Sequence, residues 1–286
     1  MNLRTSYLIP RILIFLLLLC SPVLADLKFF AHPEVPQGRS FIIYIASTEA
    51  FTEAKAVFDG RSVPFYKQGF GLKTIIGTEP DRELGQYPVR IEAKTADGKV
   101  ESNEFPIVVN SRLYPKTSFY LKPARKKLMA RDLVSEEWAD IEPLITSYTP
   151  EKLWSGQFRR PVPGIITMAF GTREYVNNKR RGPHRGVDFR AKIGTPVKAP
   201  ERGQLVYTKY LKAFGGTAIV NHGQGIFTLY FHLSKFLYPI GTFLRPGQPF
   251  ALTGNSGISS GPHLHWGISV HNVRSDPLQW VETVMP

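Results

Sequence analysis

The chain has 286 residues, of which 43% are hydrophobic and 21% charged, so its composition is that of a globular protein and excludes wholesale disorder. Its formal net charge is +13 at pH 7, and its single cysteine excludes a disulfide framework, a cysteine-rich zinc finger and an iron–sulfur cluster. The 24 Gly and 23 Pro favour turns and short strands over long helices.

Residues 1–25 are typical of a secretory signal peptide. Two arginines accompany an apolar run over residues 12–19, and small residues end the segment at Ala25. The run is shorter than the about 20 residues that a membrane-spanning helix needs. Retention as an uncleaved anchor and lipidation of Cys20 stay open as alternatives. We therefore expect secretion into a bacterial cell envelope, to the periplasm or the cell wall, with no transmembrane segment after signal removal.

Residues 26–110 are predicted to form an immunoglobulin-like β-sandwich. They hold 10 Lys and Arg against 12 Asp and Glu, whereas residues 111–286 hold 24 against 11, so the positive excess lies in the second part. Short apolar or alternating runs recur at intervals of about ten residues between Gly and Asp turns. The predicted strands are 40–47, 54–58, 63–66, 87–93 and 105–109. Because no catalytic cluster falls in this segment, we interpret it as an accessory domain.

Residues 111–160 are predicted to be a partly helical linker. The stretch 122–144 is rich in Lys, Arg, Glu, Ala and Leu, and Asp132 or Ser135 could cap a helix there. Strand signals and Gly-rich turns return after it, which predicts a β domain over residues 161–286. Its expected strands are 164–170, 204–210, 217–222, 227–232, 249–253 and 265–270.

Six of the seven histidines fall between residues 184 and 271, and four of them lie in three short motifs. On a strand, residues i and i+2 share a face, so His263 and His265 would project side by side. Gly186 allows a bend that would bring His184 and Asp188 to one point. Imidazole and carboxylate groups are the usual zinc ligands in a site without cysteine. The motifs are His184xxxAsp188, Tyr230xHis232Leu and Gly261-Pro-His263xHis265.

These motifs resemble the signature of the lysostaphin-type (LytM-like) zinc endopeptidases, which cut peptidoglycan cross-links. The resemblance covers about residues 161–275 and extends to Asn221-His-Gly and Gly254-Asn-Ser-Gly. It implies an antiparallel β-sheet metallopeptidase domain that binds one Zn²⁺ per chain. The implied metal ligands are His184, Asp188 and His265. The implied catalytic residues are His232 and His263, beside the metal but not on it.

The resemblance implies a peptidoglycan hydrolase that acts in cell-wall remodelling or lysis. Three protein ligands leave a fourth position for water, as in a catalytic zinc site. The water activated by the metal would attack the peptide bond with the help of the two histidines, and which of them is the base stays open. Among possible cross-links, stem-peptide bridges are preferred over glycyl-glycine bonds.

Two other interpretations were weighed. A non-catalytic envelope adaptor, or an activator of another cell-wall hydrolase, could use the same fold, but the complete set of motif residues argues against it. Serine catalysis is disfavoured because Ser256, Ser259 and Ser260 lie in a turn-rich segment without a Gly-x-Ser-x-Gly elbow. Of the two remaining histidines of this region, His222 is interpreted as a structural residue near a strand end. His271 is interpreted as exposed.

The basic residues around the His184 motif suggest attraction to anionic wall components, with a merely solvated loop as the alternative. These residues are Lys179, Arg180, Arg181 and Arg185. No nucleic-acid-binding module is recognisable, so nucleic acid is not an expected partner. The order of the segments also raises the hypothesis that the N-terminal part covers the groove of the resting protein.

Overall fold

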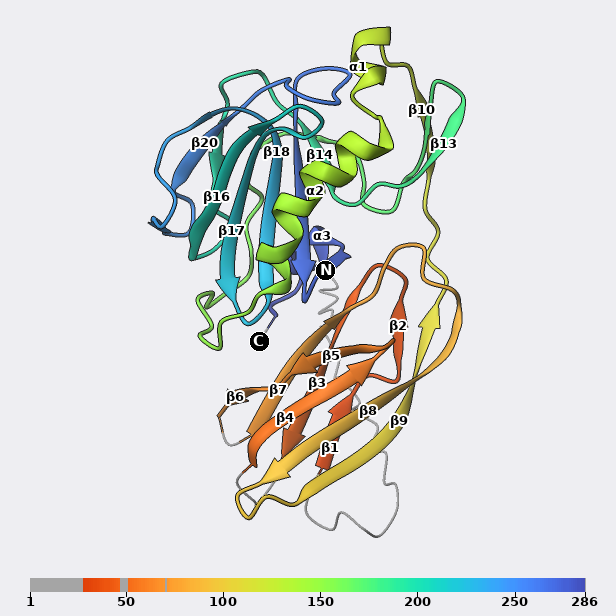
Figure 1. The fold of residues 1–286 in the computed structure, drawn as a ribbon, viewed down its shortest axis with the longest axis vertical. Coiled ribbons are helices and arrows are strands. Elements are labelled where there is room, and N and C mark those ends of the chain that lie inside the picture. Colours follow the sequence, from red (N-terminus) through yellow and green to blue (C-terminus); the bar gives the residue numbers. More distant parts are fainter. Residues whose placement is uncertain (1–27, 47–50, 70, 286) are drawn as a thin grey trace, which may run out of the picture.

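The computed structural model describes residues 28–46, 51–69 and 71–285. The predicted signal peptide therefore lies outside the described residues. Figure 1 shows two lobes, an N-terminal one made of strands and a C-terminal one in which helix α2 crosses a large sheet. None of the described helices is long and apolar enough to span a membrane.

The N-terminal lobe consists of two sheets around one core. A four-stranded sheet has the order β1 (Lys28–Ala31), β3 (Ser40–Ala46), β7 (Gly71–Gly77), β6 (Tyr66–Gln68), and a five-stranded sheet has the order β2 (Glu34–Pro36), β9 (Val100–Asn110), β8 (Gly85–Thr95), β4 (Phe51–Phe58), β5 (Arg61–Pro64). Alternation along β3 and β8 sends Ile43 and Ile91 into this core, where both are buried. The strand predicted over 63–66 is divided at Phe65 between β5 and β6. The immunoglobulin-like assignment of this lobe stays a prediction.

The segment between the lobes contains β10 (Lys116–Phe119), α1 (Pro123–Lys127) and α2 (Arg131–Thr146). The expected helical stretch is present, but neither Asp132 nor Ser135 caps a helix. The turn after α1 leads directly into α2, whose N-cap is Ala130, so both polar residues lie inside the helix. Asp132 in the first turn still interacts favourably with the helix dipole.

Helix α2 covers one face of the C-terminal sheet. Ile141 and Ile145, four residues apart and therefore on one face of the helix, are fully buried. They pack against Ile219 on β17 and against Phe227 and Leu229 on β18. Burying side chains of this size contributes about 1.5–3 kcal/mol each. Apolar burial thus fixes α2 above the sheet, as Figure 1 shows.

The C-terminal lobe is built on a ten-stranded sheet whose strand pairs are antiparallel. Its main order is β11 (Ile166–Met168), β14 (Val187–Arg190), β21 (His263–Val270), β18 (Ile226–Phe236), β17 (Gly215–Gly223), β16 (Gly203–Leu211), β19 (Phe243–Leu244), with β15 (Pro196–Lys198), β20 (Pro249–Thr253) and β22 (Val273–Ser275) attached beside it. Most predicted strands are confirmed. The strand expected over 164–170 is reduced to three residues, because the chain turns after Met168.

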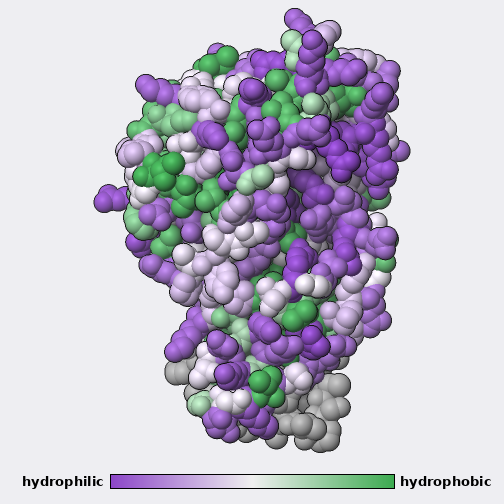
Figure 2. All heavy atoms as spheres, in the orientation of Figure 1, coloured by the Kyte–Doolittle hydropathy of each residue, from purple (hydrophilic) through white to green (hydrophobic). Residues whose placement is uncertain are grey.

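A hairpin that the sequence analysis did not predict leads into the His184 motif. Strands β12 (Arg173–Val176) and β13 (Lys179–Pro183) pair with each other, and β12 also pairs with β10. Asn177 and Asn178 make the turn with φ values of 49° and 65°, the left-handed conformation that a tight hairpin requires. Figure 2 shows hydrophilic residues gathered at the upper right, where Figure 1 places this hairpin.

The two lobes contact each other through both apolar and polar side chains. Ile42 and Ile75 of the N-terminal lobe pack with Trp154 and with Trp280 of α3 (Pro277–Glu282). Close by, the buried hydroxyls of Ser40 and Ser275 lie 2.9 Å apart. The guanidinium of Arg112 forms an ion pair with buried Asp276 at 2.8 Å. These contacts hold the N-terminal lobe beside the sheet that carries the histidines.

Candidate metal centre

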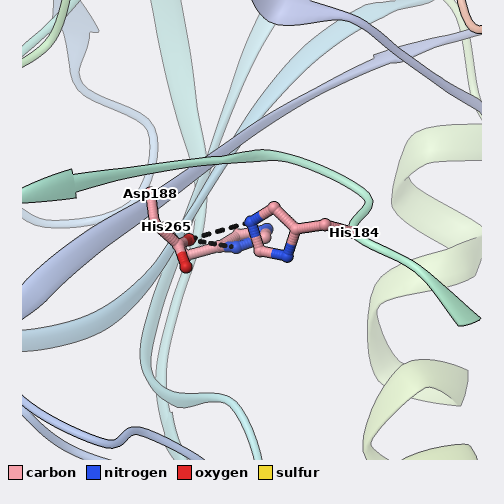
Figure 3. A group of neighbouring side chains, drawn as sticks. All are labelled: His184, Asp188 and His265. Atoms are coloured by element: carbon pink, nitrogen blue, oxygen red, sulfur yellow. Dashed lines mark hydrogen bonds and ion pairs between the residues drawn. The ribbon is translucent and has the colours of Figure 1, made fainter. Parts of the chain in front are cut away.

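The pairing of β14 with β21 brings two of the predicted ligands together. Asp188 and His265 are direct partners in the register of this antiparallel pair. His184 precedes β14, and Gly186 between them passes so close to the ring of His265 that any Cβ there would collide with it. Figure 3 shows the three side chains pointing towards one another from these two segments.

The three side chains form a compact set of donor atoms. Oδ1 of Asp188 lies 3.0 Å from Nε2 of His184 and 2.9 Å from Nδ1 of His265. All three residues are buried, and one ligand atom from each lies within 4.8 Å of the others. Two imidazoles and one carboxylate, close enough to share one ion, fit zinc.

Glu174 on β12 is a site residue that the sequence analysis missed. Its Oε1 accepts a hydrogen bond from Nδ1 of His184 at 2.5 Å, and its Oε2 lies 3.4 Å from Nη1 of Arg181. This bond places a proton on Nδ1 of His184, so Nε2 is the nitrogen that would bind a cation. The only signal for it is the Asn177-Asn178 turn, which folds Glu174 back onto the segment before His184.

His232 and His263 lie beside this set, with their ring centroids 4.7 Å apart. Nδ1 of His232 donates to the carbonyl of Ser256 at 2.7 Å, and Nδ1 of His263 donates to the carbonyl of Gly261, also at 2.7 Å. Because a carbonyl can only accept, each Nδ1 carries a proton, and Nε2 is the nitrogen that each ring keeps for exchange. Nε2 of His263 lies 3.7 Å from Oδ2 of Asp188.

The backbone at His232 is strained. Its φ is 64°, the left-handed region, although it lies inside β18. The pairing register of β18 shifts here, and the N–H of His232 turns to the carbonyl of Phe214 at 3.1 Å. Strain of this kind costs on the order of 1–3 kcal/mol and persists where the surroundings impose it. The bulge aims the ring of His232 at His263.

The charges of the site are strongly coupled. Burial alone would raise the pKa of Asp188, but His184 and His265 hold it well below its usual value. Burial disfavours the charged form of His184 as well, yet Asp188 and Glu174 together raise its pKa to about 9. Burial lowers the pKa of His265 to about 4, and burial with the neighbouring rings holds the pKa of His232 well below its usual value. The site thus carries a permanent carboxylate that a cation would neutralise.

The five residues open into a cleft of about 690 Å³. Its walls come from three parts of the chain. The N-terminal lobe contributes Glu79 and Asp81, and α2 contributes Val134, Trp138 and Glu142. The cleft is bordered in part by residues outside the β domain.

Two of the four basic residues near His184 already pair with carboxylates. Arg181 lies near Glu174, and Arg185 forms ion pairs with Glu79 at 2.8 Å and Asp81 at 3.5 Å. Lys179 and Arg180 are exposed on the hairpin and are not among the residues that line the cleft. The prediction that this group attracts anionic wall components therefore gains no support from the structure.

His222, His271 and Ser256 are engaged in contacts away from the proposed metal ligands. His222 is fully buried, with Nδ1 donating to the carbonyl of Arg202 and Nε2 accepting from Thr228, each at 2.8 Å. The prediction that His271 is exposed is wrong, because it stacks against Tyr66 of the N-terminal lobe. The hydroxyl of Ser256 donates to the carbonyl of Leu233 at 2.9 Å and is engaged with backbone.

An antiparallel sheet that presents two histidines and an aspartate with a further pair of histidines defines a metallopeptidase-like centre. Residues 182–277 match the model of Peptidase family M23. A chain from Pseudomonas aeruginosa described as a putative peptidase M23 superposes with a TM-score of 0.64 at 23% identity, covering 86% of this chain and 93% of that one. Residues 182–277 of this chain therefore form a peptidase M23 domain, and the superposition shows that the two chains share a fold.

Curated relatives match the same region. An uncharacterized metalloprotease of Haemophilus influenzae is 41% identical over 107 residues, which are 37% of this chain and 22% of that protein. The peptidoglycan DD-endopeptidase ShyA of Vibrio cholerae is 38% identical over 108 residues, 38% of this chain and 24% of that protein. The matched region thus spans about a quarter of the length of these relatives.

Proposed function

We propose that this protein is a secreted zinc metallo-endopeptidase that hydrolyses peptide cross-links of bacterial peptidoglycan. The observation that carries the proposal is the convergence of His184, Asp188 and His265 next to His232 and His263 inside one cleft. The M23 match and the peptidoglycan endopeptidases among the relatives support the substrate class. Stem-peptide bridges are the proposed target, since the V. cholerae relative is named a DD-endopeptidase.

His184, Asp188 and His265 would hold the zinc ion through Nε2, a carboxylate oxygen and Nδ1. When bound, zinc polarises a carbonyl and lowers the pKa of water to about 7. The carboxylate of Asp188 balances part of the ion's charge, and Glu174 fixes the ring of His184.

His232 and His263 would handle the proton and the developing negative charge. Each ring is oriented by a carbonyl on Nδ1, so each presents Nε2 for exchange. One ring would take a proton from the attacking water on its Nε2 and pass that proton to the leaving amine, and the other ring, when protonated on Nε2, would stabilise the oxyanion. The strained backbone of His232 supports this role, since strain of that kind gathers at functional sites.

The remaining parts of the proposal concern location and organisation. We propose that residues 1–25 direct export to the envelope and that 26–110 form an accessory domain. Residues 111–160 would act as a linker, and 161–286 would form the peptidase domain. A cell-wall substrate is consistent with this location.

Metal analysis of the purified mature protein, followed by incubation with isolated sacculi, tests the proposed activity. We expect one zinc per chain and release of muropeptides that a chelator stops and added zinc restores. Full zinc occupancy without release from any type of wall would instead favour an adaptor or an activator of another hydrolase.

A further inference from the structure

Arg274 is a buried cation on the wall of the cleft. It lies on β22, opposite Ser269 of β21, and only 5% of its surface is exposed. It lines the cleft together with His265 and His184. Nothing in the proposed hydrolysis uses its charge.

Gly267 places this guanidinium close to the metal ligands. Gly267 and His265 share one face of β21, two residues and therefore about 7 Å apart. A Cβ at Gly267 would collide with Nη2 of Arg274, so the absence of a side chain there makes room for the cation. Nη2 also donates to the carbonyl of Arg185, the residue after His184, at 2.6 Å.

The charge of Arg274 has no counter-ion among the described residues. Within the part of the chain that the structure describes, no carboxylate forms an ion pair with it, and its Nε is buried without a hydrogen-bond partner. The charge of Glu79 raises the pKa of Arg274, but its carboxylate binds Arg185 at 2.8 Å. The ring of Trp138 lies 5.7 Å from the guanidinium carbon on the side of α2.

A buried cation in this position is unfavourable unless an anion joins it. Burial, reinforced by Arg185, lowers the pKa of Arg274 to about 9, so the side chain is still charged at neutral pH. A single donor would be enough to hold the carbonyl of Arg185. The positive charge remains uncompensated, and a carboxylate is the group that would pair with it.

We propose that Arg274 binds a carboxylate of the peptide substrate next to the scissile bond. The inference rests on the proposed function and specifies its substrate: a cross-link whose residue adjoining the cleaved amide carries a free carboxylate. Gly267, beside Arg274, lies about 7 Å from His265 along β21. This spacing fits a carboxylate on the substrate residue next to the cleaved amide. Arg274 would thus be a specificity residue of the cleft.

The test compares two cross-linked peptide dimers that differ only in this carboxylate, which is free in one and a primary amide in the other. The wild-type protein should cleave the free acid with a kcat/KM about tenfold or more above the amide, the factor that a charged hydrogen bond contributes. In Arg274→Gln this ratio should fall to about one. A non-hydrolysable pair of the same peptides should bind metal-free protein in the same order.

Two further variants control the comparison. Arg274→Lys keeps the charge without the fork, so its ratio should lie between those of the wild type and Arg274→Gln. Arg245→Gln removes an exposed arginine that does not line the cleft and should keep the wild-type ratio.

The results that would overturn the carboxylate site differ from the result that would overturn the proposed peptidase activity. Equal kcat/KM of the wild-type protein for both dimers would overturn the carboxylate site while leaving the peptidase intact. An equal loss on both dimers in Arg274→Gln, with the ratio preserved, would also overturn it, because Arg274 would then only hold the Arg185 segment. No cleavage of either dimer or of sacculi by zinc-loaded wild-type protein would count against the proposed function itself.

Discussion

Asp188 is the residue on which the other site residues converge. Its carboxylate lies 2.9 Å from His265, 3.0 Å from His184 and 3.7 Å from His263. The first two contacts use the atoms assigned to the metal, whereas the third reaches the other carboxylate oxygen. This difference supports the proposed division between the metal ligands and the assisting pair.

Substitution of the two histidines of the His-x-His motif tests that division. His265→Ala should lose the zinc, because it removes one of three protein ligands. His263→Ala should keep the zinc and lose cleavage by about 100-fold or more, the contribution of a general acid or base. Zinc content and muropeptide release are measured on the same samples. Equal zinc loss in both variants would show that His263 is also a ligand.

Glu174 should act on the metal through His184. Glu174→Gln keeps a hydrogen-bond acceptor but removes the charge that raises the basicity of the imidazole. We expect zinc affinity to fall by about 10–100-fold in competition with a chelator. Glu101→Gln, whose carboxylate pairs with Lys99 on the N-terminal lobe, is the matched control. Unchanged affinity in Glu174→Gln would exclude this role.

His222 should make stability dependent on pH. Burial lowers its folded pKa from 6.5 to about 4, so between these values the unfolded chain binds a proton that the folded protein does not. Its contribution to stability is complete above pH 6.5 and is lost as the pH falls to about 4, by about 3 kcal/mol in total. Denaturant unfolding of the wild type and His222→Gln from pH 7 to pH 4 measures this.

The variant should show a flatter pH dependence than the wild type under the same metal conditions. His32→Gln, which replaces an exposed histidine, should keep the wild-type slope. A wild-type slope in His222→Gln would mean that other groups cause the loss.

At the scale of elements, α2 is tied to the loop that supports His232. Glu137 of α2 is buried and accepts hydrogen bonds from the backbone N–H groups of Ala213 at 2.9 Å and Phe214 at 3.2 Å. Phe214 in turn accepts from the N–H of His232. The helix therefore contributes to the geometry of a residue on β18.

Glu137→Gln should weaken this connection. The neutral amide replaces a charged acceptor of several N–H groups, which should lower the free energy of unfolding by about 1.5–3 kcal/mol. Zinc content should not change, since no metal ligand touches Glu137. The exposed Glu136, one residue earlier on the helix, provides the control Glu136→Gln. Equal stability of both variants would refute the role of Glu137.

The elements that the sequence predicts well are those with uninterrupted apolar patterns. β17 and β18 are buried over most of their length, and their predicted ranges lie inside the observed strands. β13 was missed because Lys179-Arg180-Arg181 breaks every apolar period, although the preceding asparagines mark a turn. α3 was missed as well, despite the pair Asp276-Pro277, in which Asp276 caps the helix.

The site residues also fall into those that the sequence predicts and those that it does not. The resemblance to the lysostaphin-type endopeptidases implied that His184, Asp188 and His265 lie near one another, and the structure does bring them together. Glu174 and Arg274 reach the cleft through a hairpin and through β22, so their place depends on tertiary contacts that no local pattern contains. The prediction that His271 is exposed was wrong for a related reason. His271 stacks against Tyr66, which comes from the other lobe.

At the scale of the whole molecule, the N-terminal lobe reaches the cleft through Glu79 and Asp81. Both bind Arg185, which follows the proposed metal ligand His184. Trp138 and Glu142 of α2 line the same cleft. These contacts are the basis for the hypothesis that the N-terminal part restricts the access of a large substrate to the cleft.

Removing these two charges together should open the cleft. Because exposed ion pairs each contribute only about 0–1 kcal/mol, the double variant Glu79→Gln with Asp81→Asn should fold normally. We expect faster release of muropeptides from sacculi and little change with a short peptide that already fits the cleft. Unchanged rates on sacculi would remove the hypothesis of restricted access. Glu53→Gln with Glu104→Gln, two exposed carboxylates of the same lobe, is the control.

The central claim is that one zinc ion is held between residues far apart along the chain. Crystals of the zinc-loaded protein measured at the zinc absorption edge test it directly. The account predicts one anomalous peak per chain, within coordination distance of His184, Asp188 and His265. A peak at another place, or none in protein that has been shown to contain zinc, would contradict it.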